Sequence, residues 1–234
     1  MALGKTKYKV VFHKEKSLKF LKDLEEQRYD DHRLYHHSRM NQVFHLYSAF
    51  SFIASYILVF INPVIAAFVG WHGMIPRQIG HFFCEPRDFD KANNMSHEEK
   101  ENVKVGYNLT RKRYLLSALG LIPLFSGVVY FAEYITISQA IEVAGYLMGL
   151  LAIIAVGGRS IYLTLVREDK MVGIVWFSKI MTDPFNDIKL YWKSPWQCLK
   201  GDWYDPGTTT YPMRRYWVDK LKRRDHDEER IITT

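Results

Sequence analysis

Two long stretches of this chain are almost free of charge, and they limit the fold more than any other feature. Residues 42–83 contain one Lys, Arg, Asp or Glu side chain, Arg77, and residues 114–166 contain three. About 20 apolar residues cross the hydrocarbon core of a bilayer as a helix, so each stretch is long enough for two crossings. The overall composition, 48% hydrophobic and 24% charged, hides this pattern because the charges are concentrated elsewhere.

A short polar connection divides each of these two stretches, which predicts two helical hairpins. Asn62-Pro63 is a turn signal in the first stretch, and residues 138–142 (SQAIE) join the halves of the second. Pro76 predicts a kink late in the second helix. The predicted spans are residues 43–61, 64–83, 114–137 and 143–166.

The distribution of basic residues predicts the orientation in the membrane. Residues 1–42 carry ten Lys and Arg, residues 84–113 carry seven and the tail from residue 167 carries thirteen, whereas the two predicted turns carry none. Cytoplasmic segments collect Lys and Arg, so all three basic segments are expected on the cytoplasmic side.

The predicted fold class is therefore an all-α polytopic membrane protein with four transmembrane helices and cytoplasmic N- and C-termini. A soluble helical protein with two buried hairpins is the alternative. The net charge of +7 follows from this topology, so nucleic acid is not an expected partner.

Three regions are predicted: a basic amphipathic N-terminal segment (1–42), a four-helix transmembrane domain (43–166) and an interfacial or cytoplasmic C-terminal region (167–234). The C-terminal region is rich in Trp and Tyr between residues 170 and 217, which suits the headgroup level of a bilayer. A lid over a lipid entrance is the alternative interpretation. Residues 172–181 are apolar but too short to span, which predicts an interfacial or re-entrant segment.

Histidines gather at the first predicted hairpin, where a polar side chain needs a reason to be present. His45 precedes the Asn62-Pro63 turn by almost the same sequence distance as His81 follows it. In two antiparallel helices these positions reach the same depth, at the cytoplasmic end. The hairpin region holds His36, His37, His45, His72 and His81.

Asn41 and Glu85 lie one helical turn further from the Asn-Pro turn, again at nearly equal distances, and form a second matched level. Two His and one carboxylate with open positions form the ligand set of non-haem Fe(II) oxygenases. A polar cluster that only holds the hairpin together is the alternative. Asn41 is expected to orient the ligands, and His72 is expected either to do the same or to act as an extra ligand. The candidate metal ligands are His36, His37, His45, His81 and Glu85, of which all but His37 are also candidate catalytic residues.

These positions resemble two motifs of the fungal and bacterial 2-hydroxy fatty acid dioxygenases, the membrane enzymes of fatty acid α-oxidation in phytosphingosine breakdown. Residues 35–45 (YHHSRMNQVFH) resemble an H-x4-N-x3-H segment, and residues 79–86 (IGHFFCEP) resemble a Gly-His followed by Glu four residues after the His. The resemblance covers roughly residues 35–90. By it, the motif positions fall on His36, Asn41, His45, His81 and Glu85.

The resemblance implies an Fe(II)-dependent membrane enzyme that oxidises a 2-hydroxy acyl chain with O2 and shortens it by one carbon. The expected partners are a lipid or fatty acid substrate, O2 and the membrane, either a bacterial inner membrane or the endoplasmic reticulum. Arg77 and Arg111 are the candidates for pairing with the carboxylate head group of the substrate. The pattern also allows a homo-oligomer.

Two further function classes are compatible with the sequence. In a b-type haem electron carrier, two His at equal depth would be axial ligands of the haem iron. In a non-catalytic membrane scaffold or transporter subunit, Glu133 and Arg159 inside the third and fourth spans would mark a pathway.

Overall fold

The computed structural model describes residues 19–25, 28, 36–89, 96, 109–166 and 170–205, without the side chains of residues 109–113 and 115. Within these ranges the chain is helical and contains no strand, which confirms the predicted all-α class. Most of the predicted N-terminal segment and the tail beyond residue 205 lie outside the described residues.

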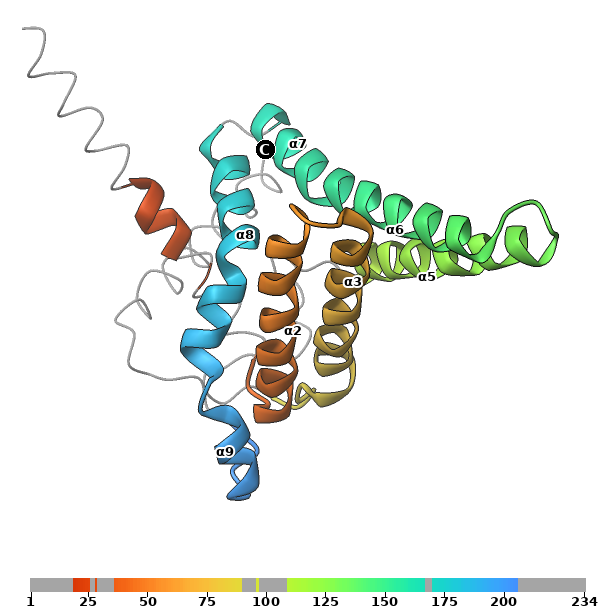
Figure 1. Cartoon of the computed structure of the whole chain (residues 1–234). Helices are drawn as coiled ribbons and strands as arrows, with labels where there is room; N and C mark the ends of the chain where they lie inside the picture. The colour runs from red at the N-terminus through yellow and green to blue at the C-terminus, as the bar shows by residue number, and fades with distance from the viewer. Residues whose placement is uncertain are drawn as a thin grey trace, which may run out of the picture.

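The first predicted hairpin is formed by α2 (Arg39–Leu58) and α3 (Pro63–Ile79), which lie side by side in Figure 1. Ser38 caps α2 by accepting a hydrogen bond from the Asn41 backbone N–H. Asn62 caps α3 in the same way, and Pro63 takes the first helical position, where its missing N–H costs no hydrogen bond. The turn thus lies where the Asn-Pro signal predicts it.

The end of α3 departs from a regular α-helix. Pro76 lies inside α3, and a π-helical turn, η1 (Gly80–Cys84), follows directly. The backbone then becomes extended at Glu85. Because a π-helical turn contains more residues than an α-helical one, it changes the direction in which the following side chains point.

The second hairpin consists of α5 (Leu109–Phe131) and a long helix made of α6 (Ile137–Ile153), η2 (Ile154–Gly158) and α7 (Arg159–Val166). The turn predicted at residues 138–142 is wrong, because these residues lie inside α6.

A capping box explains where the helix begins. The Thr136 side chain accepts a hydrogen bond from the Gln139 backbone, and the Gln139 side chain accepts one from the Thr136 backbone. Helix α6 packs on α3 and on α5, and the pair α5–α6 extends to one side of the first hairpin in Figure 1.

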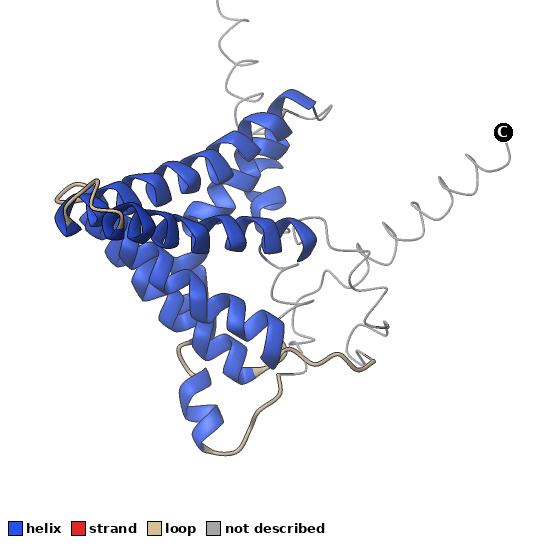
Figure 2. Cartoon of the chain, turned by 90° about the vertical axis from the view of Figure 1, so that its right-hand side faces the viewer, coloured by secondary structure: helices blue, strands red, loops and turns tan. Residues whose placement is uncertain are grey.

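Helix α8 (Met171–Tyr191) runs antiparallel to α2 and packs along it, and the short α9 (Ser194–Leu199) follows. The start of α8 is held against α7, where Ser160 Oγ donates a hydrogen bond to the Gly173 carbonyl at 2.9 Å. Residues 172–181, predicted as a short interfacial or re-entrant segment, therefore form the first half of a 21-residue helix. Figure 2 shows the helices from the side.

The surface of α8 is inverted relative to a helix of a water-soluble protein. Its inward stripe is polar and buried, with Lys179, Asp183, Asp187 and Tyr191 each one turn apart. Its outward stripe is apolar and exposed. Soluble helices show the opposite arrangement. The exposed apolar residues of α8 are Ile174, Phe177, Met181, Phe185 and Leu190, and Lys189 is exposed in the last turn.

Among the described residues, one helix, Ile137–Val166, is long and apolar enough to cross a membrane, and most of its surface is exposed. A shorter apolar helix covers Leu116–Phe131. These findings support a membrane helix in the second hairpin. The arrangement of four spans and the orientation of the termini stay predictions.

Candidate metal centre

Three histidines from separate positions in the chain meet at one end of the α2–α3–α8 bundle. His36 precedes α2, His45 lies in its second turn and His81 lies in η1. One ring nitrogen from each can be chosen so that all three atoms lie within 4.8 Å of one another, close enough to bind a metal ion. The side chains of His36 and His45 are buried.

His45 and His81 approach each other through ring nitrogens. Their Nε2 atoms are 3.0 Å apart, and the His36 ring centroid lies 4.0 Å from that of His45 and 5.1 Å from that of His81. Two nitrogens bound at right angles to a metal at about 2.1 Å would also lie about 3 Å apart. The spacing therefore suits two neighbouring ligands of one ion.

A glycine permits this approach of the two helices. An added Cβ at Gly80 would lie 2.0 Å from Asn41 Oδ1 and 3.2 Å from the Asn41 Cα atom. Only a residue without a side chain fits here, directly before His81.

Helix α8 supplies two contacts that the sequence interpretation missed. Asp187 Oδ2 lies 3.4 Å from His45 Nδ1, and the Tyr191 hydroxyl lies 2.6 Å from His36 Nδ1. Both side chains are almost fully buried. The signal in the sequence was the spacing of four residues between Asp183, Asp187 and Tyr191, which is equally typical of a solvated face.

Arg77 faces this helix instead of an open surface. Its guanidinium donates to Asp187 Oδ2 at 2.8 Å and lies 3.9 Å from Asp183 Oδ2, which also pairs with Lys179 at 3.5 Å. The two positive charges of Arg77 and Lys179 thus neutralise the two aspartate carboxylates inside the bundle. A substrate carboxylate would have to compete with both aspartates for Arg77. The side chain of Arg111, the other candidate for the head group, lies outside the described part of the chain.

Glu85, predicted as a ligand, lies beside the cluster and takes part in a different set of contacts. Its carboxylate accepts hydrogen bonds from Asn41 Nδ2 and, at 3.2 Å, from the His37 backbone N–H. The group of three mutually close ligand atoms does not include it. The two matched levels counted from the turn are both present, His45 with His81 and Asn41 with Glu85.

His37 and His72 are not members of the three-histidine group. His37 is buried, and its Nδ1 lies 2.9 Å from the Asp205 carbonyl oxygen. His72 is exposed, and its Nε2 lies 2.6 Å from the Tyr47 hydroxyl on the outer side of the hairpin. The expected role of His72 beside the metal therefore has no support in its position.

Residues 203–205 are hydrogen-bonded to the residues at the start of α2. The Asp205 backbone N–H donates to the His37 carbonyl at 2.7 Å, and the Arg39 backbone N–H donates to the Trp203 carbonyl at 3.0 Å. Asp205 also accepts hydrogen bonds from the side chains of Arg39 and Gln42, at 2.7 and 2.9 Å. These contacts hold the end of the described chain against the start of α2.

The donor set consists of imidazole nitrogens, which suit iron, zinc, copper and nickel. Burial raises the pKa of the neighbouring Cys84 thiol, and the charge of Glu85 raises it further. The thiolate, which is the form that binds metals, is thereby disfavoured. The three histidines therefore offer nitrogen ligands, which do not select one ion.

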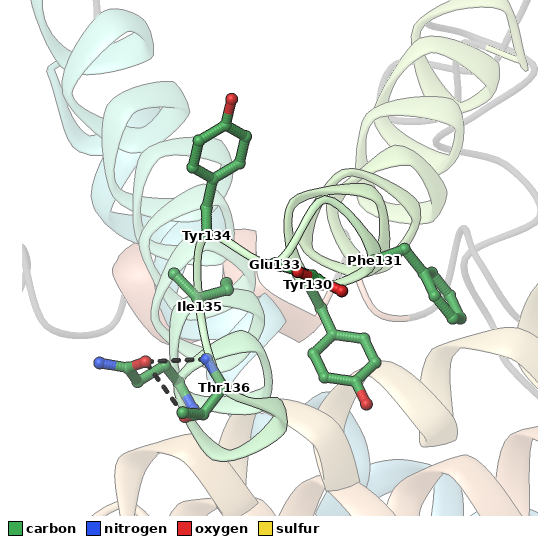
Figure 3. A pocket seen from close by; sticks show the side chains of 7 residues that line it. Tyr130, Phe131, Glu133, Tyr134, Ile135 and Thr136 are labelled. Atoms are coloured by element: carbon green, nitrogen blue, oxygen red, sulfur yellow. Dashed lines mark hydrogen bonds between the residues drawn. The ribbon is translucent and has the colours of Figure 1, made fainter.

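A separate hollow of about 420 Å³ lies at the α5–α6 turn (Figure 3). It is open to the surrounding medium, and its lining contains no histidine or cysteine. Its lining residues are Tyr130, Phe131, Glu133, Tyr134, Ile135, Thr136 and Gln139.

No family model, curated protein or solved structure matches this chain.

Proposed function

We propose that this protein is a membrane-embedded, Fe(II)-dependent oxygenase that acts on a fatty acyl or lipid substrate, with a 2-hydroxy fatty acid as the preferred class. The observation that carries the proposal is the convergence of His36, His45 and His81 at the end of a helical bundle. His36 and His45 are buried there, and imidazole is a common ligand of transition-metal ions in proteins.

The position of the motif residues supports the choice of reaction. All five residues that resemble the dioxygenase motifs lie in two adjacent layers, one of histidines and one formed by Asn41 and Glu85. Residues 36–45 and 79–86 are far apart in the sequence, so their meeting is a property of the fold. When bound, Fe(II) would supply the activation of O2, and the three histidines would hold it with positions left for substrate and oxygen.

The distribution of apolar surface supports the membrane location. Many large apolar side chains of α5, α6 and α7 are exposed, and the outer face of α8 is apolar while its inner face is charged. Exposed apolar areas of this extent mark contact with lipid or with another protein. Lipid is favoured because Ile137–Val166 is long enough to cross a bilayer.

An acyl chain could approach the cluster along apolar side chains that neighbour His81. Ile79 is 41% exposed and Phe83 is 81% exposed. Burial of each CH2 group is worth about 0.8 kcal/mol relative to water, but a substrate arriving from the bilayer gains less. The carboxylate and hydroxyl of the substrate therefore have to carry selectivity, by binding at the metal.

The geometry is less compatible with a b-type haem. Two axial nitrogens on opposite sides of a haem iron would lie about 4 Å apart, with the porphyrin plane between them. His45 and His81 are only 3.0 Å apart, and their rings meet edge to face.

The test is metal analysis and oxygen consumption of detergent-purified protein loaded with Fe(II) under anaerobic conditions. We expect one iron per chain, O2 uptake on addition of a 2-hydroxy fatty acid, and a product shorter by one carbon. The same fatty acid without the 2-hydroxyl group is the matched control and should give no uptake. Protein that retains no metal and consumes no O2 with any 2-hydroxy acid would refute the proposal.

A further inference from the structure

Helix α8 contacts two of the three clustered histidines, and in each case it does so at the Nδ1 atom of the ring. We propose that Asp187 and Tyr191 are positioning residues, which fix the tautomer and ring orientation of His45 and His36 so that Nε2 of each is presented to a metal ion. This inference rests on the proposed function in that it requires a metal at the cluster.

The contacts of Asp187 determine which nitrogen of His45 carries the proton. Its side chain is 2% exposed, and Oδ2 lies 3.4 Å from His45 Nδ1 and 2.8 Å from an Arg77 nitrogen. A carboxylate paired with Arg77 only accepts hydrogen bonds, so Nδ1 of His45 has to be the donor. The lone pair of His45 is then on Nε2, the atom that lies 3.0 Å from His81.

Tyr191 acts on His36 in the corresponding way. Its hydroxyl lies 2.6 Å from His36 Nδ1, and the two rings meet edge to face at a centroid distance of 5.5 Å. With Nδ1 in contact with the hydroxyl, the proposal assigns Nε2 of His36 to the metal. A hydroxyl both donates and accepts, so its control of the tautomer is weaker than that of a carboxylate.

Asp187 and Tyr191 are one helical turn apart, so a single rigid element orients two ligands at once. Helix α8 is itself held to α7 through Ser160 and Gly173, at the end remote from the cluster. Ligating histidines commonly donate their second N–H to a carboxylate, and loss of such a partner lowers metal affinity roughly 10- to 100-fold.

The experiment compares metal binding by Asp187→Asn, Tyr191→Phe and Asp183→Asn in the full-length, detergent-purified chain. Asp183 is the matched control, since it lies one turn earlier on the same buried stripe and pairs with Lys179 and Arg77. Co(II) is the probe, because its visible absorption reports ligand geometry as well as affinity. Circular dichroism records whether each variant keeps its helices.

We expect Asp187→Asn to bind Co(II) about 10- to 100-fold more weakly with an altered spectrum. Tyr191→Phe, which removes one oxygen and leaves the ring, should alter the spectrum with a smaller loss of affinity. Asp183→Asn should keep the wild-type spectrum and affinity within about threefold.

Different results separate the two hypotheses. If the wild type binds Co(II) and both Asp187→Asn and Tyr191→Phe keep its affinity and spectrum, the positioning role is refuted while the metal centre stands. An Asp183→Asn variant as impaired as Asp187→Asn also refutes it, since the effect would then belong to the whole stripe. If Asp187→Asn loses its helices, Tyr191→Phe decides alone. A wild type that binds neither Co(II) nor Fe(II) refutes the metal centre and the inference together.

Discussion

Gly80 is the position at which a single added methyl group should disturb the candidate metal centre most. An alanine Cβ there would lie 2.0 Å from Asn41 Oδ1, 2.9 Å from Asn41 Cγ and 3.2 Å from the Asn41 Cα atom. Rotating the Asn41 side chain relieves the first two overlaps but gives up its hydrogen bond to Glu85. The third overlap involves backbone, so α2 and α3 also have to separate slightly.

The size of the effect follows from opposing contributions. Overpacking of a tight contact costs about 1–3 kcal/mol. Loss of a hydrogen bond to a charged partner costs roughly 1.5–3 kcal/mol when that bond is given up in full. Replacing glycine by alanine in a helix stabilises the folded state by about 0.5–1 kcal/mol, because alanine loses less backbone entropy on folding. We therefore expect Gly80→Ala to lower the free energy of unfolding by about 1.5–5.5 kcal/mol, the sum of the two costs less the gain in helix propensity.

Gly149→Ala is the control, because its added Cβ would meet only Ala67 Cβ at an ordinary 3.9 Å. That variant should keep or gain stability by up to about 1 kcal/mol. Reversible unfolding in mixed detergent micelles measures both variants, and Co(II) titration shows whether the separation of α2 from α3 also weakens the metal centre. Equal stability of Gly80→Ala and Gly149→Ala would refute the close approach of the helices at Gly80.

Three further changes test other parts of the structure. His81→Ala should lower metal affinity by more than about tenfold because it removes a ligand, whereas His72→Ala should leave it unchanged; equal loss in both, measured by Co(II) titration, would contradict the assignment of the cluster. Thr136→Ala should lower the free energy of unfolding by about 1 kcal/mol, because α6 loses its N-terminal cap. An unchanged free energy of unfolding in detergent micelles would contradict the observed start of that helix. Arg77→Ala should lower the free energy of unfolding by about 3–5 kcal/mol, because the buried Asp187 carboxylate loses a positively charged partner. Unchanged stability with a raised KM for the fatty acid would instead support the head-group role predicted from the sequence.

The pairing of His45 with His81 could be predicted by counting residues from the Asn62-Pro63 turn. The prediction works because every residue of an α-helix adds the same rise along its axis, so equal distances from a tight turn give equal depth. The same count predicts that Asn41 and Glu85 meet one helical turn further from the Asn-Pro turn. It does not predict which group Glu85 contacts, since the π-helical turn and the extended backbone at Glu85 change where its carboxylate points.

The turn of the second hairpin and the nature of α8 were beyond the sequence pattern. Residues 138–142 look like a polar connection, and only the capping contacts of Thr136 and Gln139 show that a helix has already begun there. In α8, charged residues one turn apart predict equally a face in water and a face buried against other charges. The partners of these charged residues decide which of the two faces forms. The partner of Asp187, Arg77, lies on a different helix and far from it in the sequence.

The sequence by itself determined the helical class, the first hairpin and the histidine pair at its end, because helical rise, turn chemistry and apolar length act locally. The tertiary structure alone decided that α8 belongs to the same bundle and that Asp187 and Tyr191 reach His45 and His36. It also decided that Arg77 is occupied by aspartates. The physical reason is that hydrogen bonds and ion pairs between distant segments depend on where helices pack, and no local pattern records that.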